Sequence, residues 1–253
     1  MAKQIALGVV VVIALVFAAE AGTVDSITNQ KRWQGVEANF CPTCVSFSEQ
    51  AINELLNIIL NAGVVGGCSE VCSLLADKTG SQPLGQICSF LCDIVGVEVF
   101  SNLIQKADLD PIYFCELLNI CPAMDGGDAM IATIGTSPMK GPAGTTFNVN
   151  VMIDTVNGTG TGEMDVDVET LDGVPLGSSF LLEAQAAGSH YNAKVQINAT
   201  PDPSCDPMSQ PCENWLPGNY TVTVAVCNGE CNSKHPHSQV YDEKKTMFTI
   251  TEN

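Results

Sequence analysis

Two kinds of hydrophobic spacing divide the chain. Before about residue 122, apolar residues recur every three or four positions, which is the spacing of amphipathic helices. After about residue 128, apolar and polar residues alternate, as in strands with one buried face. The sequence therefore predicts a helical domain over 38–123, a polar, glycine-bearing linker over 124–128 and an all-β domain over 129–253. Residues 22–37 show no strong pattern and are expected to form a flexible lead-in.

The first domain is expected to contain four or five helices. Pro42 and Pro111 suit the first turn of a helix, and Asp110 is placed to cap the helix that Pro111 begins. The expected helices span residues 42–61, 64–78, 83–96, 97–106 and 110–118. The apolar face of the first helix comprises Val45, Ile52, Leu55, Leu56, Ile59 and Leu60.

The second domain is expected to be a β-sandwich of immunoglobulin-like type. Turn signals at Asn157-Gly158, Asp172-Gly173 and Pro217-Gly218 separate short alternating segments, as in such sandwiches. Tyr220, which follows the last of these turns, resembles the corner tyrosine of this fold. The expected strands span residues 129–136, 145–154, 162–171, 179–184, 191–198, 220–227 and 246–251.

The N-terminus predicts entry into the secretory route. Lys3 precedes a charge-free apolar stretch from Ile5 to Ala18, which is short for a membrane span. Ala19-Glu20-Ala21 matches a signal-peptidase site, so residues 1–21 are expected to be a cleaved signal peptide; an uncleaved anchor is the alternative. The same route would allow N-glycosylation at the three sequons, which begin at Asn157, Asn198 and Asn219.

The twelve cysteines are expected to be oxidised in a secreted chain. Cys68 and Cys72 lie one turn apart on one helix, as do Cys88 and Cys92 on the next. An antiparallel hairpin of these two helices predicts the pairs Cys68–Cys92 and Cys72–Cys88. The ends of the domain are then left to pair as Cys41–Cys121 and Cys44–Cys115.

Two cysteine features admit a second interpretation. The late cysteines favour the local pairs Cys205–Cys212 and Cys227–Cys231, because short loops close at low entropic cost, but crossed pairing stays open. Cys41-x-x-Cys44 could belong to a metal or redox site, yet no histidine precedes His190 to complete a metal site.

The formal net charge of −18 argues against nucleic acid as a partner, because phosphate binding needs clustered basic residues. Over residues 37–121 the acidic residues far outnumber the two lysines, Lys78 and Lys106. Repulsion from anionic membranes should fade as carboxylates protonate toward pH 4–5. Contact with a membrane surface is therefore expected to be favoured by acid.

Sequence motifs give no support to catalysis, so the protein is expected to be non-enzymatic and to need no metal or cofactor. Asp165, Asp167 and Glu169 alternate along one strand and could supply oxygens to calcium, although a solvent-facing strand shows the same pattern. His235 and His237 could form a metal-binding or pH-sensing pair, but two loop histidines are a weak signal.

The cysteine spacing of the first domain resembles that of saposin B-type domains. The resemblance rests on Cys41-Pro-Thr-Cys44 before a long apolar helix and on the closing segment from Asp110 to Cys121. Cys68 and Cys92 would add a bridge to the usual six cysteines. The resemblance implies a disulfide-stapled helical bundle that binds lipid or forms a homodimer, with the apolar face of the first helix as the candidate lipid contact. The alternative is that this face only fills the bundle.

Domain order and size resemble the countin family of social amoebae. That resemblance implies a secreted component of a multiprotein counting factor that regulates cell-group size and cell adhesion during development. Two alternatives follow from the helical domain: a lysosomal or endosomal lipid-binding activator of a hydrolase, and a pore-forming defence protein. Recovery from conditioned medium in a large assembly would favour the first hypothesis, whereas retention in acidic vesicles would favour the lysosomal one.

Overall fold

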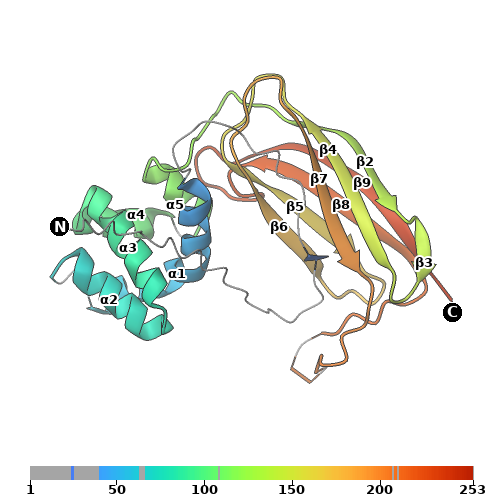
Figure 1. Ribbon diagram of the computed structural model, residues 1–253, viewed down its shortest axis with the longest axis horizontal. Coiled ribbons are helices and arrows are strands. Elements are labelled where there is room, and N and C mark those ends of the chain that lie inside the picture. The colour runs from blue at the N-terminus through green and yellow to red at the C-terminus, as the bar shows by residue number, and fades with distance from the viewer. Residues whose placement is uncertain are drawn as a thin grey trace, which may run out of the picture.

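The computed structural model describes residues 24–25, 40–62, 66–107, 109–206, 208–209 and 211–252. The expected signal peptide and most of the expected lead-in lie outside the described residues. A helical module comes first, followed by a larger β module beside it (Figure 1). Within the described part of the chain, no single helix is long and apolar enough to cross a membrane. Residues 82–95 and 97–107 meet that criterion only jointly, across a bend of 107°.

Five helices form the first module: α1 (Cys41–Ala62), α2 (Cys68–Thr79), α3 (Gln82–Val95), α4 (Val97–Ala107) and α5 (Pro111–Leu117). The Asp110 Oδ1 atom caps α5 by accepting the Tyr113 N–H at 2.7 Å, as its place before Pro111 indicated. The expected start of α2 at residue 64 is wrong. The helix begins at Cys68, because Gly66 and Gly67 hold positive φ angles of 81° and 114° that interrupt helical geometry.

The helices enclose one apolar core. Leu55 of α1, Phe100 and Ile104 of α4, and Phe114 of α5 are fully or almost fully buried in it. The rings of Phe100 and Phe114 meet edge to face with centroids 5.8 Å apart, a favoured aromatic arrangement. The core therefore draws on elements from both ends of the module.

Six disulfide bonds complete the covalent structure, with the pairing that the sequence led us to expect. Two join α2 to α3, and two join the start of α1 to α5 and the segment after it. The Cα atoms of Cys41 and Cys121 lie 4.8 Å apart although they are 80 positions apart in sequence. The bonds are Cys41–Cys121, Cys44–Cys115, Cys68–Cys92, Cys72–Cys88, Cys205–Cys212 and Cys227–Cys231.

The β module contains two sheets. One has the strand order β1-β7-β4-β2 and the other β3-β9-β8-β5-β6. The strands are β1 (Val24–Asp25), β2 (Met130–Ser137), β3 (Lys140–Pro142), β4 (Thr146–Asp154), β5 (Gly162–Glu169), β6 (Leu176–Leu182), β7 (His190–Asn198), β8 (Gly218–Asn228) and β9 (Gln239–Thr251). The sequence pattern missed β1, which falls in the expected lead-in, and β3. It also placed the start of β9 at Thr246, whereas the strand begins at Gln239.

Alternating side chains from both sheets share the core of this module. The Phe248 ring of β9 stacks on Phe147 of β4 at 4.2 Å and on Tyr220 of β8 at 5.2 Å between centroids. All three residues are fully buried. The Tyr220 hydroxyl donates a hydrogen bond to the Leu216 carbonyl at 3.0 Å, so this buried phenol is satisfied.

The segment 124–128, expected to be a linker, is hydrogen-bonded to the β module. The Asp128 Oδ1 atom accepts the backbone N–H groups of Val156 and Asn157, each at 2.8 Å. The Asn228 side-chain amide donates to the Met124 carbonyl at 3.3 Å. These bonds fix the path of the chain between the two modules.

Candidate functional site

An apolar surface lies at the start of α1 and along α3. Phe40, just before α1, stacks on Phe90 of α3 with ring centroids 5.4 Å apart, yet each ring stays about half exposed, at 49%. Ile94, four positions after Phe90 on α3, is 50% exposed. We call Phe40, Ile87, Phe90 and Ile94 the Phe90 surface. Apolar groups exposed in this way are typical of a contact site.

A groove of about 190 Å³ runs between α1 and α3 within this surface. None of the residues that line it is charged: they are Phe40, Thr43, Cys44, Gln86, Ile87, Phe90 and Leu91. An aliphatic or acyl chain could lie in such a groove without burying a charge. The groove therefore offers apolar contacts and no charged side chain to a ligand.

The apolar face of α1 occupies a different place. Val45, Ile52, Leu55 and Ile59 are 0–5% exposed and belong to the core of the bundle, and Leu56 packs against it. Leu60 is 66% exposed at the end of α1. In this closed bundle the face that the sequence indicated for lipid is therefore mostly core. The exposed apolar residues on α3 are Phe90 and Ile94, four positions apart, and half-buried Ile87 lies one turn before Phe90.

The two loop histidines contact different partners. The His235 ring stacks on Tyr113 of α5 with centroids 4.5 Å apart, and His237 Nδ1 lies 2.5 Å from Asp125 Oδ1. Both contacts link the segment between β8 and β9 to residues that precede the β module. The structure therefore uses these histidines at the junction of the modules rather than as one metal-binding pair.

The three acidic residues on β5 do not gather into one site. Asp165 Oδ1 accepts the Ser179 hydroxyl at 2.6 Å, whereas Asp167 and Glu169 are exposed farther along the strand. Among the described residues, the one group that brings three such ligand atoms within 4.8 Å is Glu163, Asp165 and Cys231. Cys231 is bonded to Cys227 and offers no thiolate, so this group is an acidic pair without a third ligand.

Several carboxyl groups near the junction have raised pKa values, Glu49 among them through burial. Burial raises the pKa of Glu230 to about 8, with Asp110 and Glu163 adding negative charge nearby. Burial also raises the pKa of Glu116 to about 7, although His237 partly opposes the shift. The pKa of Glu163 rises to about 7 through burial and the neighbouring Asp165. No local pattern marks these carboxyl groups, because they are far apart along the chain.

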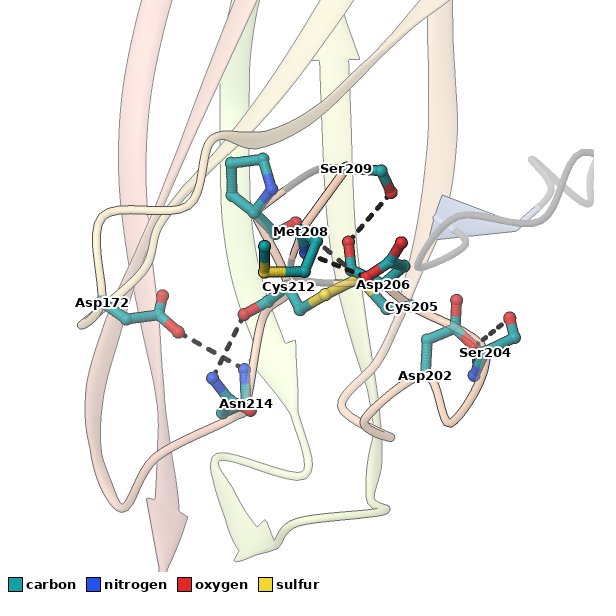
Figure 2. The surroundings of a disulfide bond; sticks show 10 residues. Asp172, Asp202, Ser204, Cys205, Asp206, Met208, Ser209, Cys212 and Asn214 are labelled. Atoms are coloured by element: carbon teal, nitrogen blue, oxygen red, sulfur yellow. Dashed lines mark hydrogen bonds between the residues drawn. A yellow bond between two sulfur atoms is a disulfide. The ribbon is translucent and has the colours of Figure 1, made fainter.

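The exposed loop around Cys205–Cys212 is organised by short-range hydrogen bonds (Figure 2). Asp202 Oδ1 accepts the Ser204 hydroxyl at 2.7 Å, and Asp206 Oδ1 accepts the Met208 N–H at 2.9 Å. Asn214 donates its backbone N–H to Asp172 at 3.4 Å, which ties the end of the loop to the β5–β6 turn. These carboxylates therefore stabilise turns within and beside the loop.

All three sequon asparagines are exposed in the β module. The Thr200 hydroxyl donates to Asn198 Oδ1 at 2.7 Å, and the Thr249 hydroxyl donates to Asn219 Oδ1 at 2.8 Å. Asn157 lies in the turn that Asp128 holds. Their exposure is compatible with glycan attachment, which stays a prediction.

Comparison with known proteins matches both modules to one family. The model of the countin N-terminal domain covers residues 39–119, and that of the countin C-terminal domain covers 129–253. Countin-1 of Dictyostelium discoideum is 35% identical over 211 residues, which are 83% of this chain and 77% of the relative. The chain belongs to the countin family. Countin-3 of the same organism is 34% identical over 83% of this chain and 89% of its own length.

Apart from β1, the two matched domains correspond to the two structural modules. Among solved structures, alkylpurine DNA glycosylase AlkC of Pseudomonas fluorescens, bound to DNA containing an abasic-site analogue, aligns with 81% of this chain and 47% of its own. The TM-score is 0.34 at 13% identity, which is too weak to carry an argument about fold or function.

Proposed function

We propose that this countin-family protein is a secreted, non-enzymatic regulator of cell-group size that acts in a complex with other secreted proteins. The observation that carries the proposal is the match of both modules to countin domains, with three countins aligned over more than four fifths of the chain. Six disulfide bonds support an oxidising, extracellular location. The expected signal peptide and sequons point the same way.

Added protein should reduce cell-group size. A secreted signal accumulates with the number of cells that release it, so extra protein should make a group respond as if it were larger and divide. The measurement is the number of cells per group when Dictyostelium discoideum develops with the purified, oxidised protein. Reduced and alkylated protein is the control, since it lacks the six disulfide bonds. Unchanged groups at saturating amounts of oxidised protein would contradict the proposal.

The second part of the proposal is that the Phe90 surface contacts lipid. Its support is the uncharged groove and the half-exposed rings of Phe40 and Phe90. Figure 1 shows α2 and α3 on the side of the helical module away from the β module, and Phe90 and Ile94 of α3 are 49% and 50% exposed. A partner protein with an apolar side chain would be the alternative occupant.

Vesicle binding should therefore depend on Phe90 and Ile94. The double variant Phe90→Asp/Ile94→Asp should bind phosphatidylcholine–phosphatidylserine vesicles about tenfold or more weakly, because two apolar contacts are lost and two charges added. Co-sedimentation at pH 4.5 and 7.4 measures this, and wild-type binding should be stronger at pH 4.5. Met139→Asp is the matched control, since Met139 is 70% exposed on the β module. Equal binding by both variants, or stronger binding at pH 7.4, would count against lipid contact at this surface.

A further inference from the structure

The outer side of the sheet that contains β4 and β7 carries mainly amide side chains. In the antiparallel register, Asn150 of β4 lies opposite Lys194 of β7, and Asn148 lies opposite Gln196. Val149, between the two asparagines, is fully buried, so alternation along the strand directs the asparagines away from the core. We call these four residues, together with Met152 and Asn192, the amide face: Asn148, Asn150, Met152, Asn192, Lys194 and Gln196.

A hollow of about 420 Å³ lies in the amide face, and the residues that line it come from β2, β4 and β7 (Figure 1). Small-molecule sites in proteins commonly have volumes of about 300–1,000 Å³. Asn150, Asn192 and Lys194 line the hollow. Gly135 of β2, which pairs with Asn150, adds open space beside it, because a Cβ atom at this position would have no neighbour within 4 Å. The hollow therefore has the size of a ligand site and polar walls.

The side chains around the hollow keep most of their hydrogen-bonding capacity. Within the described part of the chain, the side chains of Asn192 and Lys194 make no hydrogen bond or ion pair with another residue. Asn150 donates one amide hydrogen to the Asn148 carbonyl at 3.4 Å and keeps its side-chain oxygen free. Gln196 donates to Asn148 Oδ1 at 3.2 Å, which holds these two amides in place. Asn150 and Asn192 can therefore each donate to and accept from a ligand.

The amide face is nearly uncharged, although the chain has a formal net charge of −18. Lys194 is its only charged residue, and the one acid of β4 and β7, Asp154, lies 2.8 Å from His190 Nδ1. The outer side of the opposite sheet is acidic, because β5 has an acid at every second position over Glu163–Glu169. The scarcity of charge is therefore particular to the side with the hollow, and it favours an uncharged ligand that has many hydrogen-bonding groups.

We propose that the amide face binds an uncharged oligosaccharide. Sugar hydroxyls both donate and accept hydrogen bonds, as the amides of Asn150 and Asn192 do, so the two kinds of group are complementary without any charge. Lys194 adds a further donor. Met152, which lines the hollow and is 39% exposed, offers an adaptable apolar side chain to the C–H groups of a sugar ring.

Other classes of ligand fit the amide face less well. The centres of protein–protein interfaces are enriched in aromatic residues and arginine, and the amide face contains neither. Phosphate-rich ligands need clustered basic residues, whereas Lys194 is a single cation. The apolar groups that suit lipid lie on α3 in the other module, at the Phe90 surface. Because an uncharged sugar contributes no ion pair, its binding should change little with salt concentration.

Binding of the full oxidised chain to an array of neutral glycans, built from hexoses, N-acetylhexosamines, deoxyhexoses and pentoses, tests the proposal. N-glycosidase treatment first removes any sugar attached at the sequons, such as Asn198 at the end of β7. Wild type should bind at least one glycan class, and Asn150→Ala/Asn192→Ala should bind it about tenfold or more weakly, because several hydrogen bonds are lost. The matched control is Asp167→Ala/Glu169→Ala, two exposed positions on β5, which should bind as wild type.

A second variant leaves the amides unchanged and fills the space beside them. Gly135→Leu adds a side chain where nothing lies within 4 Å, so it should keep the wild-type melting temperature and still weaken glycan binding. Nuclear magnetic resonance of the side-chain amides reports contact directly. The signals of Asn150 and Asn192 should shift when the glycan is added, whereas that of Asn61 on α1 should not.

Two results would overturn the proposal. One is a wild-type chain that binds no glycan of the array. The other is a glycan that binds Asn150→Ala/Asn192→Ala as tightly as wild type. If the same variant lost its effect on cell-group size although wild type bound no glycan, the amide face would be assigned to a protein partner instead. The array uses purified protein without cells, so its outcome is separate from that of the group-size experiment.

Discussion

Replacing Cys41, Cys44, Cys115 and Cys121 together by serine should lower the free energy of unfolding of the helical module by at least about 4 kcal/mol, the chain-entropy cost of opening the long loop that the two bonds close. Cys41 and Cys121 are 80 positions apart and Cys44 and Cys115 are 71 apart, so the long loop opens only when both bonds are removed. All four cysteines are buried, at 0–4% exposed. Urea unfolding followed by far-ultraviolet circular dichroism measures the loss.

The matched comparison is the double variant Cys205→Ser/Cys212→Ser. That bond joins cysteines only 7 positions apart, so the same relation gives a smaller loss of about 2.5 kcal/mol, and in the β module. A loss from the variant that lacks both long-range bonds no larger than that from the short loop would show that loop closure is not their main contribution.

Phe248→Ala should destabilise the β module by about 3–5 kcal/mol, because truncation leaves a cavity that rigid neighbours fill poorly. Phe248 is fully buried and stacks on Phe147 of the opposite sheet and on Tyr220 of the neighbouring strand. One side chain therefore supports contacts both within and between the sheets. Guanidinium unfolding of the full chain, read by the fluorescence of Trp215 near Phe248, measures the loss.

Met247→Ala is the control for this change. Met247 is the preceding residue on β9, but its side chain is 53% exposed. Alternation along the strand places it on the other face, so its loss should change stability by no more than about 0.5 kcal/mol. Similar losses for the two variants would mean that the stacked rings are not the centre of this core.

The disulfide framework of the helical module was predictable because its geometry is local. Cys68 and Cys72 are one helical turn apart, as are Cys88 and Cys92, and a two-helix hairpin leaves a simple pairing between them. The cap at Asp110 and the prolines in first turns predicted most helix ends to within one or two residues. The start of α2 was missed because Gly66 and Gly67 turn the chain just where an apolar stretch suggested that the helix had begun.

The candidate contact surface was harder to place, because periodicity shows that a helix has an apolar face but not what covers it. The face of α1 that holds Leu55 is covered by the other helices, whereas Phe90 and Ile94 on α3 are left exposed. Whether a short segment forms a strand also depends on its pairing with a distant strand. Lys140–Pro142 becomes β3 only because it lies parallel to β9, and the residues themselves carry no strand signal.

The junction could not have been found from sequence. Asp110 and Ser233 are 123 positions apart, and nothing near either residue in the chain indicates the other. Glu230 looks like an ordinary loop glutamate until the fold buries it beside Asp110 and Glu163. Interactions of this kind depend on how two separately encoded modules dock, which local patterns do not specify.

The bond between Cys41 and Cys121 also determines how the helical module would respond to proteolysis. This bond joins the first and last cysteines of the helical module to each other. Three further disulfide bonds lie between them in sequence. A single backbone cleavage anywhere between residues 41 and 121 therefore leaves two pieces that remain covalently joined. Nicked molecules would keep their full mass until a reductant is added.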